Sequence, residues 1–334
     1  TTDMLDLVVE RQAVEQSLSS MAGTVKAHVI RDSLGYDGDG VTIGQIETST
    51  NSVHSINVRN IMESVAPNAF YEVRAASNIA SFYSSVESLI TAGCSIINCS
   101  LSFPEDDQGT RTNWYTNEEK WVDHIEGPHG ISFVKSAGNN GTSHGSISSP
   151  GMAYNAITVG AINDNDTWQN QDDDTVQASS SSANGGGNYC SKPDVMAPAT
   201  SFPSGDGTSF YSGTSYAAPV VSGVIAQIME FKPYLKGNSR LVKAALTASC
   251  YYKASETLYT GYTGLTAVEG AGVINANNFY LIIAGNQYYS GSFTADELNY
   301  SISFTGPNFR IGLAFARISS IGSNHNNPVT NPAE

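Results

Sequence analysis

Short apolar segments alternate with helix-like segments through the first half of the chain, and this alternation restricts the fold more than any other feature of the sequence. The apolar segments have the length of strands, and those between them have helical character. Such alternation predicts βαβ units, and therefore a parallel sheet covered by helices on both faces. With right-handed crossovers the sheet becomes doubly wound. The expected strands are 41–46, 69–73, 95–101, 131–134 and 156–159, and the expected helices are 54–65, 80–92 and 114–125.

Polar residues stand at the ends of three of the expected strands. Glu47 follows the first strand, 100–102 close the third, and Gly138 and Asn139 come shortly after the fourth. The carboxyl ends of parallel strands meet at one edge of a sheet, where binding and catalysis usually gather. We therefore expect these residues to lie close together.

The string SGTSYAAP at 212–219 leads into a long apolar run at 220–229 with helical composition. Ser215 is therefore expected at the start of a helix, where its backbone N–H has no helical partner and can face a ligand. Pro219 falls in the first helical turn, where its missing N–H costs little. Taken alone, the tripeptide Gly-Thr-Ser can also be interpreted as a simple helix N-cap.

The eight-residue string resembles the nucleophile motif of the subtilisin-like serine proteases (subtilases). Other segments are similar to segments of that family, in the same order, from about residue 25 to about residue 285. The resemblance implies an α/β fold with a doubly wound, mainly parallel sheet and helices on both faces. It also implies a serine endopeptidase that hydrolyses peptide bonds through an acyl-enzyme. The similar segments are 35–43, 64–69, 95–102, 136–141, 192–198 and 270–275.

The resemblance assigns a role to each catalytic candidate. Acyl transfer needs a nucleophile, a base, a group that orients the base, and donors for the oxyanion. Ser215 is expected to be the nucleophile, His54 the general base and acid, and Glu47 the carboxylate that orients His54. The side-chain amide of Asn139 and the N–H of Ser215 are expected to stabilise the oxyanion. This chemistry requires no cofactor and no metal.

The sequence departs from the subtilase pattern at two points. Glu47 stands where the family usually has Asp, and His54 follows it after only seven residues instead of some tens. Glu serves as the acid in some other Ser-His hydrolases. A surface acid at 47 and a polar helix start at 54 are the alternative interpretations. They would make the protein a catalytically impaired subtilase-fold binding module, and a third hypothesis places an adhesive function in the C-terminal strands.

The resemblance also implies which residues bind a peptide substrate. The segment Ser100, Leu101 and Ser102 is expected to pair with the substrate as an added strand. Leu101, Ser102, Ser136, Ala137 and Ser148 are expected to line the pocket for the residue before the scissile bond. These side chains are small and neutral, so an apolar or uncharged residue is expected there. Gly138 and Thr214 complete the predicted set.

Net charge and hydropathy limit the classes of partner that the protein can have. The formal net charge is −15, with 31 acidic and 16 basic residues, so a nucleic-acid surface is disfavoured. No run of about 18 apolar residues is present that could span a membrane. Residues 1–21 are polar and periodic and do not resemble a signal peptide. Protein or peptide substrates are the expected partners, and the expected location is secreted or cell-surface, as a processed form.

Three regions are expected: a helical extension at 1–24, a peptidase domain at 25–287 and a partial β region at 288–334. Segments 288–293, 299–304 and 310–316 look like antiparallel strands, too few for a free-standing sandwich. A propeptide or a C-terminal segment absent from this chain could therefore be a partner. The acidic loop 164–190 could hold structural calcium, although a solvated surface loop is preferred because it lacks spaced ligands. Cys94 and Cys99 are expected to be buried thiols.

Overall fold

A computed structural model describes most of the segment that resembles the subtilases. Its helices follow the expected order, with α2 (Val53–Val65), α3 (Ile79–Thr91), α4 (Asn117–His129), α5 (Thr214–Phe231), α6 (Ser239–Ser249) and α7 (Ala276–Ala284). Residues 15–24 are also helical, and a π-helical turn, η1 (Val29–Ser33), and a 3₁₀ turn, η2 (Pro233–Leu235), connect other elements. The described residues are 15–103, 115–142, 147–183, 191–199, 202–203, 210–252, 254, 265–288, 319–321 and 328–330.

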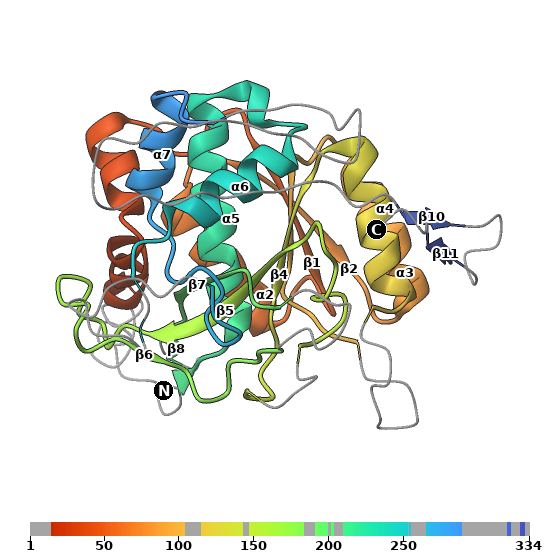
Figure 1. The fold of residues 1–334 in the computed structure, drawn as a ribbon, viewed down its shortest axis with the longest axis horizontal. Helices are drawn as coiled ribbons and strands as arrows, with labels where there is room; N and C mark the ends of the chain where they lie inside the picture. Colours follow the sequence, from red (N-terminus) through yellow and green to blue (C-terminus); the bar gives the residue numbers. More distant parts are fainter. Residues whose placement is uncertain are drawn as a thin grey trace, which may run out of the picture.

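The central sheet is almost entirely parallel (Figure 1). Its strands are β1 (Thr42–Glu47), β2 (Phe70–Ala75), β3 (Ile96–Cys99), β4 (Ser132–Ser136), β5 (Ile157–Asn163), β6 (Thr175–Val176) and β7 (Val195–Pro198). Their spatial order is β2-β1-β3-β4-β5, and β5 then pairs with β7 in parallel and with the short β6 in antiparallel. The sequence order reverses beside β1, so the sheet is doubly wound as expected.

Helices cover both faces of the sheet. Figure 1 shows α3 and α4 on one side and α5, α6 and α7 on the other. Alternate residues of the strands supply the two cores, because side chains on a strand point to opposite faces. Ile43 and Ile96 pack with α2 and α5, whereas Ile46 and Ile97 pack with α3 and α4. Two buried layers of this size fix the strand ends relative to one another, and the strand ends carry the candidate site.

Helix α5 is the most deeply buried helix among those described. Its residues from Ala217 to Met229 are all buried, and it packs closely against α2. The Gln227 side-chain amide donates to the carbonyls of Ala27 and Val65, which satisfies its donors inside the core. A helix held on all sides presents its first turn in a fixed position, and Ser215 belongs to that turn.

Two short strand pairs lie outside the central sheet among the described residues. β8 (Phe202–Pro203) pairs with β9 (Phe210–Tyr211), and β10 (Ser319–Ile321) pairs with β11 (Pro328–Thr330), both antiparallel. The predicted strands 299–304 and 310–316 lie outside the described residues, as does 288–293 beyond its first residue. The proposed division at 24 and 287 therefore stays a prediction.

Several boundaries differ from those expected from the sequence. The fourth helix was expected at 114–125 but runs from Asn117 to His129, because its cap is Thr116 and Gly130 adopts a left-handed φ of 61° at its end. Helix α7 and strand β7 were not expected as such. Cys94 and Cys99 are buried free thiols, in agreement with the expectation, and Cys250 is also buried.

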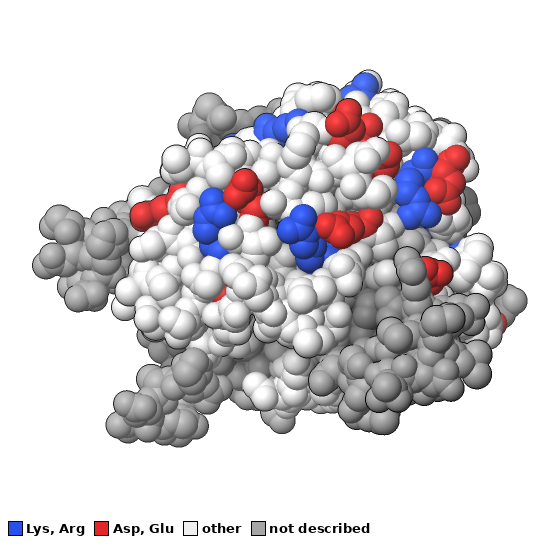
Figure 2. Space-filling model, turned by 180° about the vertical axis from the view of Figure 1, so that it is seen from behind, with Lys and Arg blue, Asp and Glu red and all other residues white. Residues whose placement is uncertain are grey.

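The hydropathy of the described helices and the charge on one face of the molecule bear on membrane and nucleic-acid partners. Along the described stretches, no helix is long and apolar enough to cross a membrane. The face drawn in Figure 2 is mostly uncharged, and several of its basic side chains lie next to acidic ones. Ion pairs among the described residues include Arg59–Glu63 at 2.7 Å and Arg74–Glu72 at 2.8 Å. A continuous basic surface, which nucleic acid would require, is not seen on that face.

Candidate active site

The nucleophile candidate lies in the first turn of α5. Gly213, directly before the helix, has a φ of 149°, which L side chains rarely adopt. A Cβ at Gly213 would also come within 3.0 Å of the Asn139 side chain. Glycine is therefore required for the chain to enter the helix at this angle. Ser215 follows two residues later, and its N–H is one of the four that the helix itself leaves without a partner.

Reciprocal hydrogen bonds tie Ser215 to the end of β3. The Ser215 hydroxyl donates to the Ser100 carbonyl at 3.2 Å, and the Ser100 hydroxyl donates to the Ser215 carbonyl at 2.9 Å. Behind them, Asn98 donates to the Ser100 hydroxyl at 3.0 Å and accepts from Ser222 at 3.0 Å. This buried network fixes the first turn of α5 against the segment that was expected to bind substrate.

Glu47 and His54 are in direct contact. Nδ1 of His54 lies 2.9 Å from Oε2 of Glu47, the last residue of β1, whose side chain is only 2% exposed. A carboxylate accepts hydrogen bonds, so this contact places the proton on Nδ1 and leaves Nε2 as an acceptor. The His54 side chain is 39% exposed, so part of the imidazole is open to solvent. The shortened connection therefore still brings the carboxylate of Glu47 into contact with the imidazole of His54.

Neighbouring side chains hold this pair in place. Gln45 donates to the second carboxylate oxygen of Glu47 at 3.3 Å and to the Ser55 carbonyl at 2.8 Å. The hydroxyl of Ser52 caps α2 by accepting from the Ser55 N–H at 3.1 Å. The bond from Gln45 to Ser55 joins β1 to the start of α2, and the Ser52 cap fixes the first turn of α2. They were not expected from the sequence, although Gln45 stands out as a polar residue in an apolar strand.

The imidazole lies beside the turn that carries Ser215 without bonding to it. The rings of His54 and Tyr216 stack, with centroids 5.7 Å apart and planes inclined by 30°. Within the part of the chain that the structure describes, no hydrogen bond joins His54 to Ser215, whose hydroxyl is directed to Ser100. Rotation of the Ser215 side chain is therefore needed to bring nucleophile and base together. Catalytic hydrogen bonds are often loose before substrate binds.

Asn139 is anchored by its oxygen. Its Oδ1 accepts from the Thr214 N–H at 3.0 Å and from the Thr214 hydroxyl at 3.2 Å. The two N–H groups of the amide therefore remain to bind a ligand beside the N–H of Ser215. Gly138 makes the close approach of the two loops feasible, because it has a φ of 107° and its N–H donates to the Thr214 hydroxyl at 2.9 Å. Two donors for an oxyanion thus stand on adjoining segments.

The predicted substrate-binding residues gather on both sides of Ser215. Ser100, Leu101 and Ser102 follow β3, with Ser102 exposed, and Ser136, Ala137 and Gly138 form the end of β4 and the turn after it. Ser148 adjoins the second segment, since its N–H donates to the Ala137 carbonyl at 2.9 Å. The contacts of Thr214 join it to the same turn. The topology therefore brings all the predicted residues to one edge of the sheet.

A residue at this edge that was not expected is Lys135, the penultimate residue of β4. It is fully buried, and its ammonium group donates to the hydroxyls of Ser136 and Ser148. The sequence signal was a single basic residue directly after the apolar run 131–134. Lysines are rarely buried in this way, so its position calls for a physical reason.

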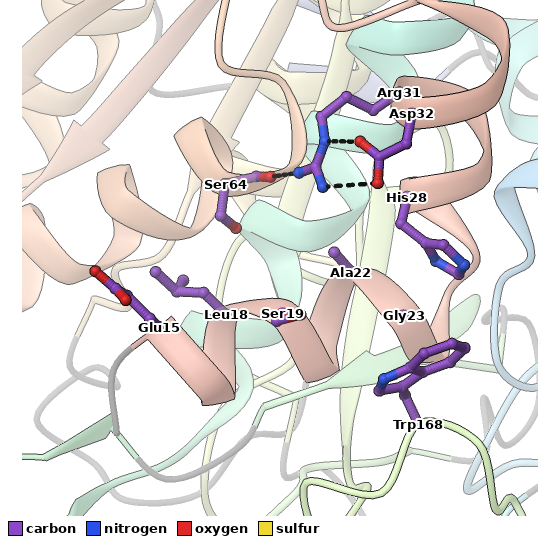
Figure 3. Close-up of a pocket in the computed structure, with 10 residues that line it drawn as sticks. All are labelled: Glu15, Leu18, Ser19, Ala22, Gly23, His28, Arg31, Asp32, Ser64 and Trp168. Atoms are coloured by element: carbon purple, nitrogen blue, oxygen red, sulfur yellow. Dashed lines mark hydrogen bonds and ion pairs between the residues drawn. The ribbon is translucent and has the colours of Figure 1, made fainter. Parts of the chain in front are cut away.

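A second hollow lies away from these residues. Figure 3 shows it between the helix at 15–24, η1 and the end of α2, with Arg31 bonded to Asp32 and to the Ser64 carbonyl. Ser64 stands ten residues after His54 on α2, about 15 Å along the helix axis. The hollow is therefore separate from the candidate active site. Its lining comprises Glu15, Leu18, Ser19, Ala22, Gly23, His28, Arg31, Asp32, Ser64 and Trp168.

The acidic loop at 164–190 is where structural calcium was expected. Among the described residues, no three or more His, Cys, Asp or Glu side chains are grouped so as to hold a metal ion. Residues 184–190 of the loop lie outside the described ones. Structural calcium therefore stays a prediction.

Comparisons with known proteins identify the family of the chain. Residues 45–272 match the model of the subtilase family. The chain belongs to the subtilase family. This subtilase is 33% identical over 167 residues to serine protease AprX of Bacillus subtilis, covering 45% of the chain and 35% of AprX. It is 37% identical over 106 residues to subtilisin-like protease 1 of Pseudogymnoascus destructans, and the match covers 30% of the chain and 22% of that protease. The chain thus spans about a third or less of each of these relatives.

Solved structures support the fold. The crystal structure of MycP1 without its N-terminal propeptide matches this subtilase with a TM-score of 0.52 and 18% identity, covering 78% of the chain and 96% of MycP1. The psychrophilic subtilisin-like protease Apa1 from Pseudoalteromonas sp. AS-11 matches with a TM-score of 0.56 and 14% identity. This match covers 81% of the chain and 98% of Apa1. At these identities the likeness establishes a subtilisin-like α/β fold.

Proposed function

We propose that this subtilase is a serine endopeptidase that uses Ser215, His54 and Glu47 as its catalytic triad. The observation that carries the proposal is the contact between the carboxylate of Glu47 and Nδ1 of His54, beside the helix turn that bears Ser215. A buried carboxylate at this nitrogen holds the imidazole in the tautomer whose Nε2 can accept a proton. Surface acids and helix caps have no need of such an arrangement.

The first step moves the serine proton. The Ser215 hydroxyl leaves the Ser100 carbonyl, rotates toward His54 and gives its proton to Nε2 as its oxygen attacks the substrate carbonyl. The positive charge that forms on the imidazole is stabilised by Glu47. Collapse of the tetrahedral intermediate expels the amine, which takes the proton from His54, and water then repeats the sequence to release the acid.

The negative charge on the substrate oxygen is stabilised by Asn139 and the Ser215 N–H. Because Thr214 fixes the amide oxygen of Asn139, its N–H groups need no reorganisation when the charge develops. The substrate backbone pairs with Ser100, Leu101 and Ser102 as an added strand. The reaction uses protein groups alone, and a protein or peptide is the substrate.

Glutamate takes the place of the usual aspartate in this proposal. Its additional methylene spans the distance to an imidazole placed by a very short connection, since only seven residues separate Glu47 from His54. Secretion as a processed form, and completion by a propeptide or a C-terminal segment, belong to the same proposal.

The test is covalent labelling with a fluorophosphonate, which reacts with an activated serine. We expect the wild type to label, and Ser215→Ala and His54→Ala to lose labelling and casein cleavage by at least about 1,000-fold. Matched controls are Ser84→Ala, an exposed serine on α3, and His129→Ala at the end of α4. Both controls should label as the wild type does.

The alternative is a binding module with an impaired site, which the bond from Ser215 to Ser100 favours because it occupies the nucleophile. Folded wild type that labels no faster than Ser215→Ala, and that cleaves no casein, would establish this alternative and refute the endopeptidase.

A further inference from the structure

The imidazole of His54 needs support at more than one point. Glu47 holds it at a single atom, Nδ1, at 2.9 Å, and the side chain is 39% exposed. A ring bonded at one atom can still tilt about that contact, which would turn Nε2 away from the helix turn that carries Ser215. Because proton transfer requires a defined direction at Nε2, a contact with the face of the ring would fix what the bond to Glu47 leaves free.

Tyr216 makes a contact of this kind. Its ring stacks on the imidazole of His54, with centroids 5.7 Å apart and planes inclined by 30°. Tyr216 is 3% exposed and packs in the core, where the residues of α5 from Ala217 to Met229 are also buried. The phenol ring is therefore a fixed surface, against which the partly exposed imidazole can rest.

A second contact joins the same two helices. Asn57 stands three residues after His54 on α2, and its side-chain amide donates to the Tyr216 hydroxyl at 3.5 Å. Tyr216 directly follows Ser215 on α5. The ring that supports the base and the hydroxyl that the base must deprotonate are therefore carried by successive residues of one helix turn.

We propose that Tyr216 is a positioning residue, which holds the imidazole of His54 toward Ser215 and stabilises its protonated form. This inference rests on the proposed endopeptidase function. The face of a tyrosine ring attracts a cation within about 6 Å of its centroid, and the imidazolium formed when His54 accepts the serine proton lies within that distance. Glu47 from β1 faces one edge of this imidazolium and Tyr216 from α5 faces its plane, so both stabilise the transient charge.

The experiment measures kcat, KM and the pH profile of kcat/KM on one peptide for Tyr216→Leu and Tyr216→Phe. Leucine removes the aromatic face, so kcat should fall by about 10- to 100-fold with little change in KM. The imidazolium also loses its attraction to the ring, so the acid-side midpoint of the profile should move to lower pH by about 0.5 unit. Phenylalanine keeps the aromatic face and should restore both the wild-type kcat and the wild-type midpoint.

Phe231→Leu is the matched control. It removes an aromatic ring from the other end of α5, where Phe231 packs against Tyr36 and Tyr280. This variant should lose stability, but its kcat and its acid-side midpoint should equal those of the wild type. A purely structural role of Tyr216 would give the same result in Tyr216→Leu.

Fluorophosphonate labelling of the wild type separates the two proposals. If the wild type labels and Tyr216→Leu keeps either the wild-type kcat or the wild-type midpoint, the role of Tyr216 is refuted and the endopeptidase stands. If the wild type neither labels nor cleaves any peptide, both proposals fail. Should Tyr216→Leu not fold by circular dichroism, replacement of Tyr216 by pentafluorophenylalanine decides, because it keeps the shape of the ring and removes the negative potential of its face. That replacement should lower the midpoint as leucine does, and an unchanged midpoint would refute the proposal.

Discussion

The length of one side chain determines whether His54 is held at the site. The Glu47 carboxylate reaches Nδ1 from the end of β1, and Gln45 fixes its other oxygen. Since β1 is paired on both sides, by β2 and β3, the backbone at Glu47 cannot move to compensate for a shorter side chain. The charge and the reach of Glu47 can therefore be tested separately.

Two substitutions at Glu47 separate these properties. Glu47→Gln keeps the reach but removes the charge that stabilises the imidazolium, so kcat should fall by roughly 10²- to 10⁴-fold. Glu47→Asp keeps the charge but withdraws it by one methylene, which should cost about 100-fold in kcat/KM. Steady-state kinetics on one peptide substrate measures the effects of both substitutions. Glu63→Gln, at the other end of α2, is the control and should retain full activity. Activity in Glu47→Gln equal to the wild type would contradict an orienting role for this carboxylate.

At the scale of the elements, the entry into α5 depends on a single backbone conformation. Gly213 has a φ of 149°, and the Asn139 side chain occupies the space where a Cβ would lie. The start of the helix and the oxyanion donor are therefore coupled through one glycine.

Gly213→Ala should disturb both the start of α5 and the position of the Asn139 side chain. We expect a loss of about 1–3 kcal/mol in the free energy of unfolding from backbone strain. We also expect a fall in kcat larger than the rise in KM, because the displaced Asn139 acts on the transition state. Thermal unfolding and steady-state kinetics measure the two effects. Gly127→Ala is the control, since no atom lies within 4 Å of its Cβ and it stands in α4. That variant should gain about 0.5–1 kcal/mol, and an equal gain in Gly213→Ala would refute the coupling.

The sequence contained enough information for the framework and the triad candidates. Apolar strands and amphipathic helices have distinct periods, so the first five strands and three of the helices could be placed to within a few residues. The carboxyl-end rule for parallel sheets then grouped Glu47, Ser100 and Asn139 before any coordinates. The pairing of Glu47 with His54 was implied by the resemblance to the subtilases, although the spacing between them departs from the family pattern.

Other features depend on tertiary contacts that leave little trace in the sequence. Helix α7 was not expected, because 276–284 is brief and follows a glycine-rich turn. Its Asn275 cap becomes visible only in the fold. The bond from Ser215 to Ser100 joins residues far apart in the chain. Lys135 looked like the end of a strand, and its place between Ser136 and Ser148 depends on how two loops fold over it.

At the scale of the whole molecule, buried charge makes stability depend on pH. Burial would raise the pKa of the Asp194 carboxyl, but the ammonium groups of Lys192 and Lys243, at 2.7 and 3.0 Å, hold it below its usual value. Asp174 behaves in the opposite way. Burial raises its pKa to about 7, although a hydrogen bond from the Tyr252 hydroxyl lowers it, and the charge of Asp164 raises it further.

The direction in which Asp174 changes the stability with pH follows from its raised pKa. Its stabilising contribution is complete below the unfolded value of about 4 and is lost as the pH rises through about 7. Asp174→Asn keeps an oxygen for Tyr252 and cannot ionise. Relative to the wild type, this variant should therefore become progressively more stable between pH 5 and pH 8, as measured by urea unfolding. Asp172→Asn, at an exposed neighbour, should show no such trend. A difference between Asp174→Asn and wild type that does not change with pH would contradict the assignment.

The short connection between Glu47 and His54 has a consequence for how the protein comes into being. In the proposed triad, Glu47 and His54 belong to one local unit, whereas Ser215 comes only with α5, after most strands of the sheet have been synthesised. A chain emerging from the ribosome therefore cannot form the proposed triad before α5 has been synthesised and has packed.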